Sequence, residues 1–381
     1  MRILHVVDSL EPTRGGVAAA VQHLCEQLYS AGASVEVVSA GPPVAIAGRG
    51  EISHYAVPAS GPFGLSLRLG RWLQDNIRRF DVVELHGVFH YPSIRAGMVA
   101  RRAGVPYVVH PHGSLDLFDI DRHRRGLKWA VGTVILRPLL NQAYCVLVTT
   151  PREGERLHTF GAKPTVMSVG LPVEMSAPAS PQSTFRHRYG IPDSAFLLLF
   201  LGRLERKKGI ERLLEAAASS SGVHVVIAGT GDMTYVSALR ERAETLAASV
   251  TWVGFISGTD KAAAFSAADA FVLHSDNENF AVTVIEAARS GLPLILSEDV
   301  FIASVFSTAG GALIASRDPG ALVSCIAELA SSPGLARAMG QHAKEVALRH
   351  FNPHKLTVAH LDVLRTAVGS ASPKSGAVDH R

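Results

Sequence analysis

Two basic side chains in the second half of the sequence fall where a predicted strand ends. The apolar run Phe196–Phe200 predicts a buried strand, and Arg203 and Lys208 follow it closely. Open α/β sheets bind ligands in the crevice outside the carboxyl ends of their strands, and a planar arginine fork with a compact lysine charge suits a diphosphate. We therefore predict a diphosphate site at Arg203 and Lys208, and interpret Arg206 and Lys207 as a solvated basic turn.

Two glutamates follow a later apolar run, Ala270–Leu273. Seven residues lie between Glu278 and Glu286, so on a helix the two carboxylates lie at most about 12 Å apart along the axis. That spacing is close to the reach from the ribose to the sugar of a nucleotide-sugar. Glu286 stands in an apolar helix and needs hydrogen-bond partners there, for which ribose hydroxyls and backbone groups are both open.

A glycine pair, Gly15 and Gly16, follows the first predicted strand and opens a helix of small residues. Glycine lets the backbone approach a ligand closely, and a helix N-terminus attracts phosphate. The pair fits a phosphate-binding loop or a plain tight turn. The absence of a GxGxxG sequence disfavours a dinucleotide site.

Two groups of histidines stand at predicted strand ends. His86 and His90 follow one strand, and His110 and His112 follow the next. Such strand-to-loop junctions face the ligand-binding crevice, so these residues are candidates for catalysis. A metal site is the alternative, but turn residues interrupt both groups and no carboxylate has HExxH-like spacing. The sequence therefore predicts no metal.

Apolar runs alternate with helix-period segments along the whole chain, which predicts an α/β protein with two doubly wound parallel sheets. The predicted strands are Ile3–Val7, Val35–Val38, Val82–Leu85, Tyr107–His110 and Cys145–Thr149, and then Phe196–Phe200, His224–Ile227, Val250–Val253, Ala270–Leu273 and Leu292–Leu296. The predicted parts are a first domain at 1–172, a linker rich in proline and serine at 173–183, a second domain at 184–350, a helix at 351–369 that crosses back to the first domain, and a flexible tail at 370–381.

Composition excludes several other classes. The 381 residues are 47% hydrophobic and 18% charged, which is enough apolar material for two cores. Three distant cysteines predict neither disulfides nor a zinc site. The first apolar run is too short for a signal peptide, and none reaches the roughly 20 residues of a membrane span, so we expect a cytoplasmic protein. A net charge of +4 without a basic stripe disfavours nucleic acid as a partner.

The basic segment at residues 122–137 is a candidate for contact with an anionic membrane. Arg124 and Lys128 are four residues apart and share a helical face. The apolar residues of another face are Leu127, Val131, Val134 and Ile135. Such a helix can lie on an anionic leaflet, or it can pack its apolar face on the sheet with its arginines in water.

In this order and spacing the motifs resemble the retaining glycosyltransferase family four over nearly the whole chain. The matching segments are Gly15-Gly16, Leu85–Gly87, Pro111–Leu115, Gly202–Gly209, Gly229–Gly231 and Glu278–Glu286. The resemblance implies the GT-B fold, in which two Rossmann-like domains face each other across a cleft that holds the active site. It implies a nucleotide-diphosphate-sugar donor, a saccharide or lipid-linked acceptor, and neither metal nor cofactor.

The resemblance also assigns roles to side chains. Arg203 and Lys208 match the pair that neutralises the donor diphosphate. Glu286 matches the carboxylate that binds the ribose. Glu278 matches the carboxylate near the transferred sugar, and His112 the histidine beside that sugar.

Backbone groups complete the implied donor site. The loop of Gly15 and Gly16 should approach the phosphates, and Asn279, Phe280 and Ala281 should meet sugar and phosphate through their backbone. The family very often has glycine at the position of Ala281. The added methyl group bears on which donor sugar is accepted, though not on whether a donor binds.

The implied function is a metal-independent, retaining hexosyltransferase of bacterial surface polysaccharide or glycolipid synthesis, cytoplasmic or peripheral at the inner face of the plasma membrane. A nucleotide-sugar 2-epimerase and a non-catalytic sugar-binding module share the fold and are the alternatives. The carboxylate segment Glu278–Glu286 together with Gly202-Arg203 favours the transferase.

Overall fold

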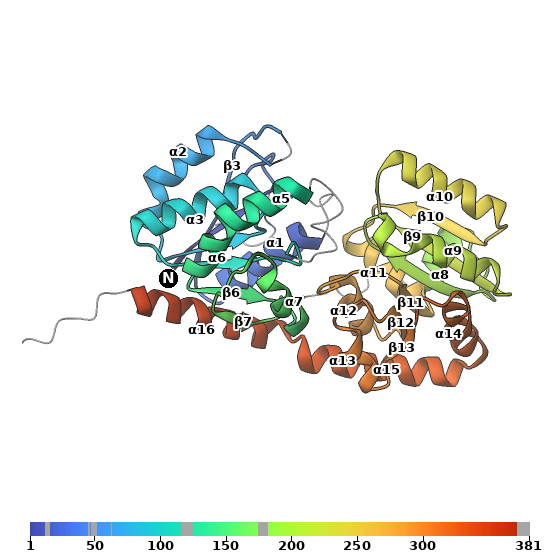
Figure 1. Cartoon of the computed structure of the whole chain (residues 1–381). Helices are drawn as coiled ribbons and strands as arrows, with labels where there is room; N and C mark the ends of the chain where they lie inside the picture. The colour runs from blue at the N-terminus through green and yellow to red at the C-terminus, as the bar shows by residue number, and fades with distance from the viewer. Residues whose placement is uncertain are drawn as a thin grey trace, which may run out of the picture. The chain divides into compact units, whose positions relative to one another are not determined.

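The computed structural model describes residues 1–11, 16–44, 46, 52–61, 63–115, 125–173 and 182–371. Its contacts divide the chain into two units, Met1–Pro172 with Pro353–Arg381, and Val173–Asn352. Each unit has its own parallel sheet, and the C-terminal helix α16 (Pro353–Ala371) belongs to the first unit (Figure 1). Most of the predicted linker and of the predicted tail lies outside the described residues.

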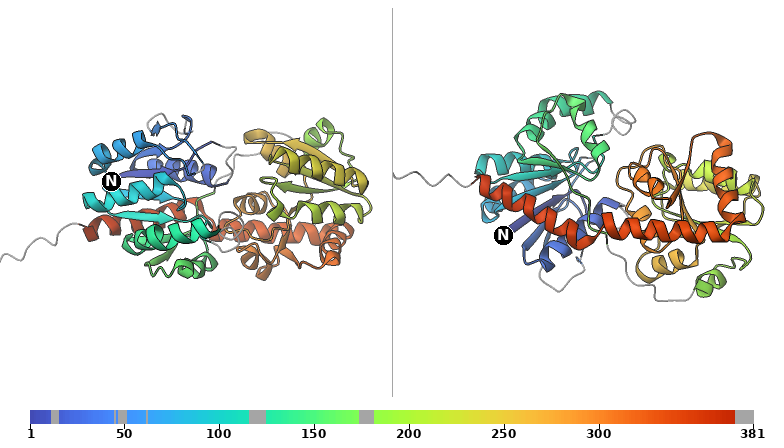
Figure 2. Two further views of the ribbon diagram at one scale, coloured as in Figure 1. Left: turned by 45° about the horizontal axis from the view of Figure 1, so that its top comes forward. Right: turned by 90° about the horizontal axis from the view of Figure 1, so that it is seen from below.

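The sheet of the first unit has seven parallel strands in the order β3-β2-β1-β4-β5-β6-β7. They are β1 (Arg2–Val7), β2 (Ser34–Ser39), β3 (Ser53–Ala56), β4 (Val82–His86), β5 (Tyr107–His110), β6 (Cys145–Val148) and β7 (Val166–Ser168). The α-helices are α1 (Gly16–Ser30), α2 (Leu67–Asn76), α3 (Tyr91–Ala103), α5 (Arg125–Val131), α6 (Arg137–Gln142) and α7 (Pro151–Glu155), besides α16. Helix α16 packs on α1 and on strands β4 and β5, and both views of Figure 2 show it beside this sheet.

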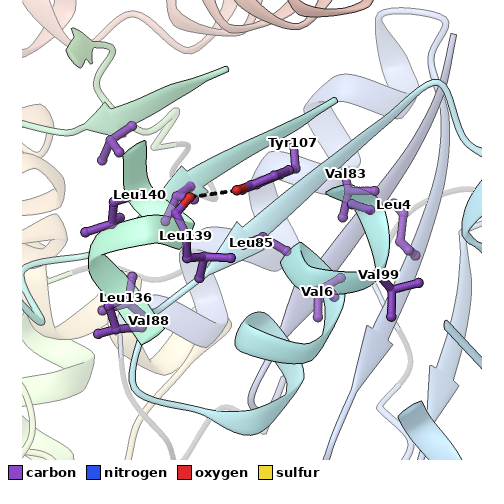
Figure 3. Packing of buried hydrophobic residues seen from close by; sticks show 14 of the residues in the cluster. Leu4, Val6, Val83, Leu85, Val88, Val99, Tyr107, Leu136, Leu139 and Leu140 are labelled. Carbon is purple, nitrogen blue, oxygen red and sulfur yellow. Dashed lines mark hydrogen bonds between the residues drawn. The ribbon is translucent and has the colours of Figure 1, made fainter. Parts of the chain in front are cut away.

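Apolar side chains of the sheet and of helices α3 and α6 form the core of the first unit (Figure 3). Val83 and Leu85 of β4 meet Val99 of α3 there, and all three are buried. Tyr107 brings a hydroxyl group into this core and donates a hydrogen bond of 2.7 Å to the carbonyl oxygen of Leu139. The bond satisfies the buried hydroxyl and ties β5 to α6.

The sheet of the second unit has six parallel strands in the order β10-β9-β8-β11-β12-β13. They are β8 (Phe196–Leu201), β9 (Val223–Ala228), β10 (Val250–Gly254), β11 (Ala270–Leu273), β12 (Leu294–Ser297) and β13 (Ala312–Ala315). The α-helices are α8 (Gln182–Arg188), α9 (Ile210–Ala218), α10 (Met233–Thr245), α11 (Gly258–Ala267), α12 (Val282–Arg289), α13 (Ala303–Thr308), α14 (Pro319–Ser331) and α15 (Pro333–His350). The prediction of two doubly wound parallel sheets is confirmed.

Strand order reverses at one place in each sheet, between β1 and β4 in the first and between β8 and β11 in the second. Helices that follow the two strands of such a pair leave in opposite directions, so a crevice opens at the strands' carboxyl ends. These two switch points are where each sheet can receive a ligand.

The sequence missed three strands, and all three lie at sheet edges. Strands β3, β7 and β13 have three or four residues each and are only partly buried. An edge strand pairs on one side and needs no continuous apolar run, so its pattern resembles that of a loop.

The basic segment differs from the regular amphipathic helix that the sequence predicts. Its first three residues, 122–124, lie outside the described part of the chain. Helix α5 is followed by a π-helix, Gly132–Leu136, before α6 begins. The extra residue per turn rotates the apolar face, so Gly132 and Leu136 are buried while Val134 is 74% exposed. Leu127, in α5, is 47% exposed. Of the apolar face that was expected to pack on the sheet, Val131 packs against the core, whereas Leu127 and Val134 do not.

Among the described residues, no helix is long and apolar enough to cross a membrane.

Candidate functional site

Two loops meet at the switch point of the second sheet. The loop after β8 carries Arg203 and ends in a 3₁₀ turn, Arg206–Lys208, and the loop after β11 carries Glu278. The Lys208 ammonium forms an ion pair with Glu278, and both side chains are largely buried. The structure thus brings together the residues that the sequence assigned to the diphosphate and to the sugar.

Glycines allow these loops to approach each other. A Cβ atom at Gly209, whose φ is +67°, would overlap the carbonyl oxygen of His274. Cβ atoms at Gly229 and Gly231 would overlap the carbonyl oxygens of Gly202 and Leu204. Close packing of the loops around Lys208 and Glu278 therefore requires glycine at these positions.

Arg212 of α9 anchors the loop after β11. Its guanidinium donates to the carbonyl oxygen of His274 at 2.8 Å, to His274 Nδ1 at 2.9 Å and to Asp276 at 2.8 Å. Because Nδ1 of His274 accepts, its Nε2 carries the proton and donates to the carbonyl oxygen of Ser316 at 2.9 Å. Burial lowers the pKa of His274, so the ring stays neutral and the loop stays fixed.

The remaining basic residues of the β8 loop lie nearer the solvent. Arg203 pairs with Glu205 at 2.6 Å, and its side chain is 47% exposed. Arg206 lies over the ring of Tyr235 at 4.9 Å and is mostly exposed. The exposure of Arg206 agrees with its interpretation as part of a solvated turn.

Glu286 is buried in α12 and accepts a hydrogen bond of 2.5 Å from the Lys261 ammonium of α11. The sequence left ribose hydroxyls and backbone groups open as partners and did not foresee a lysine. The side chain of Lys261 is 30% exposed, so the ion pair reaches from the helix core to the surface of the unit.

The residues between the two glutamates have unusual backbone geometry. Ala281 has φ +47° and ψ +61°, the left-handed region that a non-glycine residue rarely occupies, and it is the N-cap of α12. Phe280 is buried against the ring of Phe351 at 5.7 Å, so it presents its backbone rather than its side chain. Helix α12 begins at Val282, directly after Ala281, and the N-terminus of a helix favours an anion.

His112 of the first unit follows β5 and also has a left-handed backbone, with φ +52°. The next residue, Gly113, donates its N–H to the Glu153 carboxylate at 2.6 Å, and the same carboxylate accepts from Thr149 at 2.8 and 2.9 Å. Glu153 is buried in α7. It therefore holds the turn that carries His112.

A buried cluster of imidazoles surrounds Glu84 of β4. The Glu84 carboxylate accepts from His110 Nε2 at 2.7 Å and from His360 Nε2 of α16 at 2.9 Å. His5 Nδ1 lies 2.9 Å from His86 Nε2, and His86 Nδ1 lies 3.0 Å from His112 Nε2. Five histidines and one carboxylate are thus joined from β1 to α16.

Burial sets the protonation of this cluster. It lowers the pKa of His5 to about 4, although Glu84 opposes the shift. It lowers the pKa of His112 to about 3, and His110 adds to that effect. Burial alone would raise the pKa of Glu84, but His360, His5 and His110 outweigh it and hold this pKa well below its usual range. At neutral pH the carboxylate is charged, and His5 and His112 are neutral.

Three overlapping sets in this cluster have ligand atoms close enough for a metal ion: His86, His110 and His112; His5, Glu84 and His86; and Glu84, His110 and His360. In each set, however, some of these atoms already hydrogen-bond one another. The rings of His86 and His112 lie within 22° of parallel and share a bond of 3.0 Å. Nitrogens that point at each other along one bond do not converge on a third point as metal ligands must.

Gly16 begins α1 and has open space where a Cβ atom would stand, so no internal contact requires glycine there. Its neighbour Gly15 lies outside the described residues.

Two family models match the chain. The glycosyl transferase 4-like domain matches residues 15–170, and the model of glycosyl transferases group 1 matches residues 181–346. The chain belongs to the group 1 glycosyltransferases. It is a hexosyltransferase of the GT-B fold.

Relatives of this glycosyltransferase span its full length. The O-antigen chain mannosyltransferase C of Escherichia coli is 25% identical over 98% of this chain and 100% of its own. A GDP-mannose-dependent alpha-mannosyltransferase of Mycobacterium tuberculosis is 29% identical over 77% of this chain and 78% of its own. The structure of Anabaena HepE in complex with UDP and glucose has a TM-score of 0.80 at 17% identity, covering 96% of this chain and 100% of that one.

The sequence of the glycosyltransferase had singled out Lys208, Glu278, Glu286 and His112 but not the residues that hold them. Lys261, Arg212 and Glu153 are charged residues on helices, where charges usually face water, and so gave no signal. Polar residues inside apolar strand patterns, such as His5 and Glu84, could have been found as buried groups that need partners.

Proposed function

We propose that this glycosyltransferase transfers a hexose, with retention of configuration, from a nucleotide-diphosphate-sugar to a saccharide acceptor hydroxyl. The observation that carries the proposal is the Lys208–Glu278 ion pair at the switch point of the second sheet. A cation and a carboxylate that neutralise each other without ligand can separate when a diphosphate competes for the lysine.

The separation frees both side chains for the donor. Lys208, with Arg203 at the rim, contacts the diphosphate, and Glu278 then accepts hydrogen bonds from the sugar hydroxyls. Glu286, oriented by Lys261 at 2.5 Å, binds the ribose. The diphosphate role of Lys208 and Arg203 follows from their charge and their place after β8. The sugar role of Glu278 and the ribose role of Glu286 are those that the family resemblance implies.

Backbone groups complete the donor site. The N–H groups of Asn279, Phe280 and Ala281, at the start of α12, meet the phosphates and sugar. In the first unit, the phosphate contact at Gly15 and Gly16, where α1 begins at Gly16, and the sugar contact at His112 are roles that the family resemblance implies.

Bond cleavage leaves negative charge on the nucleoside diphosphate and an oxocarbenium-like sugar. Lys208, Arg203 and the helix N-termini stabilise the growing charge, so the proposed chemistry needs no metal ion. The acceptor hydroxyl attacks on the face that the diphosphate leaves. Its proton passes to the departing phosphate oxygen, and the anomeric configuration is retained.

Mannose is the hexose that we propose first, because the two relatives named above are mannosyltransferases. The O-antigen role of one of them supports a surface polysaccharide or lipid-linked glycan as acceptor. The exposed side chains of Leu127 and Val134 support attachment at a membrane surface, with the enzyme on its cytoplasmic side.

The test combines donors with acceptors. Purified enzyme is incubated with GDP-mannose, UDP-glucose or ADP-glucose, with and without a lipid-linked saccharide acceptor, and nucleoside diphosphate release is measured. Acceptor-dependent release from GDP-mannose supports the proposal. Conversion of the sugar to its 2-epimer without acceptor would replace it with the epimerase reading.

Membrane attachment has its own test. Sedimentation with anionic and neutral liposomes should show binding to the anionic ones, which Leu127→Ser/Val134→Ser weakens. Equal recovery with both lipids would point to a soluble acceptor.

A further inference from the structure

Two buried histidines, His5 and His86, and the partly buried His112 form a line from Glu84 to the end of β5. His112 Nε2 lies 3.0 Å from His86 Nδ1, and His86 Nε2 lies 2.9 Å from His5 Nδ1. Nε2 of His5 in turn faces Oε1 of Glu84 at 3.9 Å. Within the part of the chain that the structure describes, this nitrogen and this oxygen are buried without a hydrogen-bond partner of their own.

Each neutral imidazole has one N–H group and one lone pair, so it donates at one nitrogen and accepts at the other. A line of neutral imidazoles can therefore run in only two ways, with every proton on Nε2 or every proton on Nδ1. Rings of adjacent members lie within 12° and 22° of parallel, which fits such a line.

Glu84 decides between the two directions. If the protons sat on Nδ1, the lone pair of His5 Nε2 would face the carboxylate, and the two would repel each other at 3.9 Å. If they sit on Nε2, the His5 N–H points at the charge. His110 and His360 each donate to the other carboxylate oxygen, at 2.7 and 2.9 Å, and these bonds keep Glu84 ionised.

We infer that Glu84 is a positioning residue that acts through His5 and His86 to fix His112 in the tautomer with its proton on Nε2. In this tautomer His112 presents the lone pair of Nδ1 and accepts a hydrogen bond there instead of donating one. Hydrogen bonds that point the same way along the line strengthen one another, so the preference is transmitted over two rings. Glu153, which holds the turn at Gly113, fixes the backbone of the same residue.

The inference rests on the proposed function in one respect, since the ligand group that donates to Nδ1 is assigned as a hydroxyl of the donor sugar. The tautomer itself is a property of the free protein. It can be measured without substrate, so failure of the tautomer and failure of the function are distinguishable.

The measurement is a long-range ¹H–¹⁵N correlation spectrum of protein labelled with ¹⁵N-histidine, at neutral pH and without ligand. The signals of His112 are assigned by their loss in His112→Gln. We expect a single tautomer with the proton on Nε2. A proton on Nδ1, or signals of a metal-bound ring, would overturn the inference even if no other variant folds.

Two variants separate the charge of Glu84 from its packing. Glu84→Gln keeps the shape and removes the charge, so the Nδ1–H tautomer of His112 should appear. His360→Gln exchanges the imidazole beside the same carboxylate for an amide and leaves the charge of Glu84, so the Nε2–H tautomer should persist. An unchanged His112 spectrum in Glu84→Gln would contradict the inference.

The kinetic constants kcat and KM separate a change of tautomer from a simple loss of stability. Glu84→Gln should lower kcat at least about tenfold, as wrong tautomers do in other imidazole catalysts, with little change in the KM for the donor. His360→Gln should keep a kcat near that of the native chain. If Glu84→Gln changes the tautomer of His112 but leaves kcat unchanged, Glu84 does set the tautomer as we infer. The proposed role of His112 in sugar transfer would then be wrong.

Discussion

In the second unit the carboxylate of Glu278 and the ammonium of Lys208 neutralise each other's charge, and this ion pair predicts how each residue affects donor binding. In the proposed donor site, a diphosphate would compete with Glu278 for Lys208. The Glu278 carboxylate would then weaken nucleotide binding while it assists the sugar, so its two effects should have opposite signs.

Glu278→Gln should separate these effects. Without the competing charge, a free nucleoside diphosphate should bind up to about fivefold more tightly, which corresponds to an ion pair worth about 1 kcal/mol. Transfer should fall, because the amide holds the sugar hydroxyls less well than a carboxylate. Isothermal titration with GDP or UDP gives the first quantity and a turnover assay the second. Weaker nucleotide binding together with slower transfer would contradict the competition.

Ala281 occupies a left-handed conformation at the start of α12. A left-handed L-residue costs roughly 1 to 2 kcal/mol, part of which glycine loses again through its freedom in the unfolded chain. Ala281→Gly should therefore raise the free energy of unfolding by up to about 1 kcal/mol in chemical denaturation. Ala247→Gly is the matched control, because Ala247 has φ +50° and lies outside the site. Both substitutions should raise the free energy of unfolding, and only Ala281→Gly should change the preference among donor sugars. A lower free energy of unfolding for Ala281→Gly would show that the backbone at Ala281 is not strained.

The sequence predicted candidate site residues, and it did not predict the residues that contact them. Lys208 and Glu278 were predicted because each follows an apolar strand, a pattern that is local in the chain. The partner of Glu286 was not, because Lys261 is 25 residues away and only the packing of α11 against the sheet brings it near. Similarly, nothing in the sequence alone pairs Glu84 with His360, 276 residues further on.

At the scale of elements, glycines determine how closely the loops of the second sheet pack. Gly209→Ala places a methyl group against the carbonyl oxygen of His274 in a left-handed backbone. Gly222→Ala is the matched control, since Gly222 has φ +72° but open space around it. Overpacking of this kind costs typically 1 to 3 kcal/mol, so Gly209→Ala should lose about 2 kcal/mol more stability than the control. Urea unfolding measures the difference, and equal losses would show that the loops do not need close contact.

The sequence predicted strands correctly where a strand has a neighbouring strand on each side. Central strands such as β8 and β11 are continuous apolar runs and were predicted within a residue or two of their ends. The edge strand β7 has one partner and three residues, and the π-helix at Gly132–Leu136 depends on the ring of Phe160, which leaves no room for a side chain at Gly132. Such features are decided by neighbours distant in the chain, so local patterns could not predict them.

For the whole molecule, the buried histidines predict acid sensitivity of the first unit. The folded pKa of His5 is about 4 and that of His112 about 3, below the unfolded value of about 6.5. Between these values the unfolded chain binds the extra protons, so acidification favours unfolding. Each such histidine contributes up to about 1.4 kcal/mol per pH unit, present above about pH 6.5 and lost as the pH falls toward about 4.

Tryptophan fluorescence can follow the first unit alone. Trp252 belongs to β10 of the second unit, so in Trp252→Phe the signal comes from Trp72 and Trp129. The urea midpoint of this protein should fall between pH 7.5 and pH 5. Adding His112→Gln should reduce the fall, and adding His342→Gln, at an exposed histidine, should leave it unchanged. A midpoint independent of pH would contradict the buried neutral imidazoles.

The central claim is that the switch point of the second sheet holds the donor diphosphate of a glycosyl transfer. Its most direct test is acceptor-dependent release of nucleoside diphosphate by the native chain, Lys208→Ala and the neighbouring Lys207→Ala. We expect Lys208→Ala to lose roughly a hundredfold or more in turnover, as when one preorganised charge-stabilising donor is removed, with a melting temperature close to the native one. Lys207→Ala should stay near the native rate. Near-native turnover of folded Lys208→Ala, or equal losses in the two variants, would contradict the account.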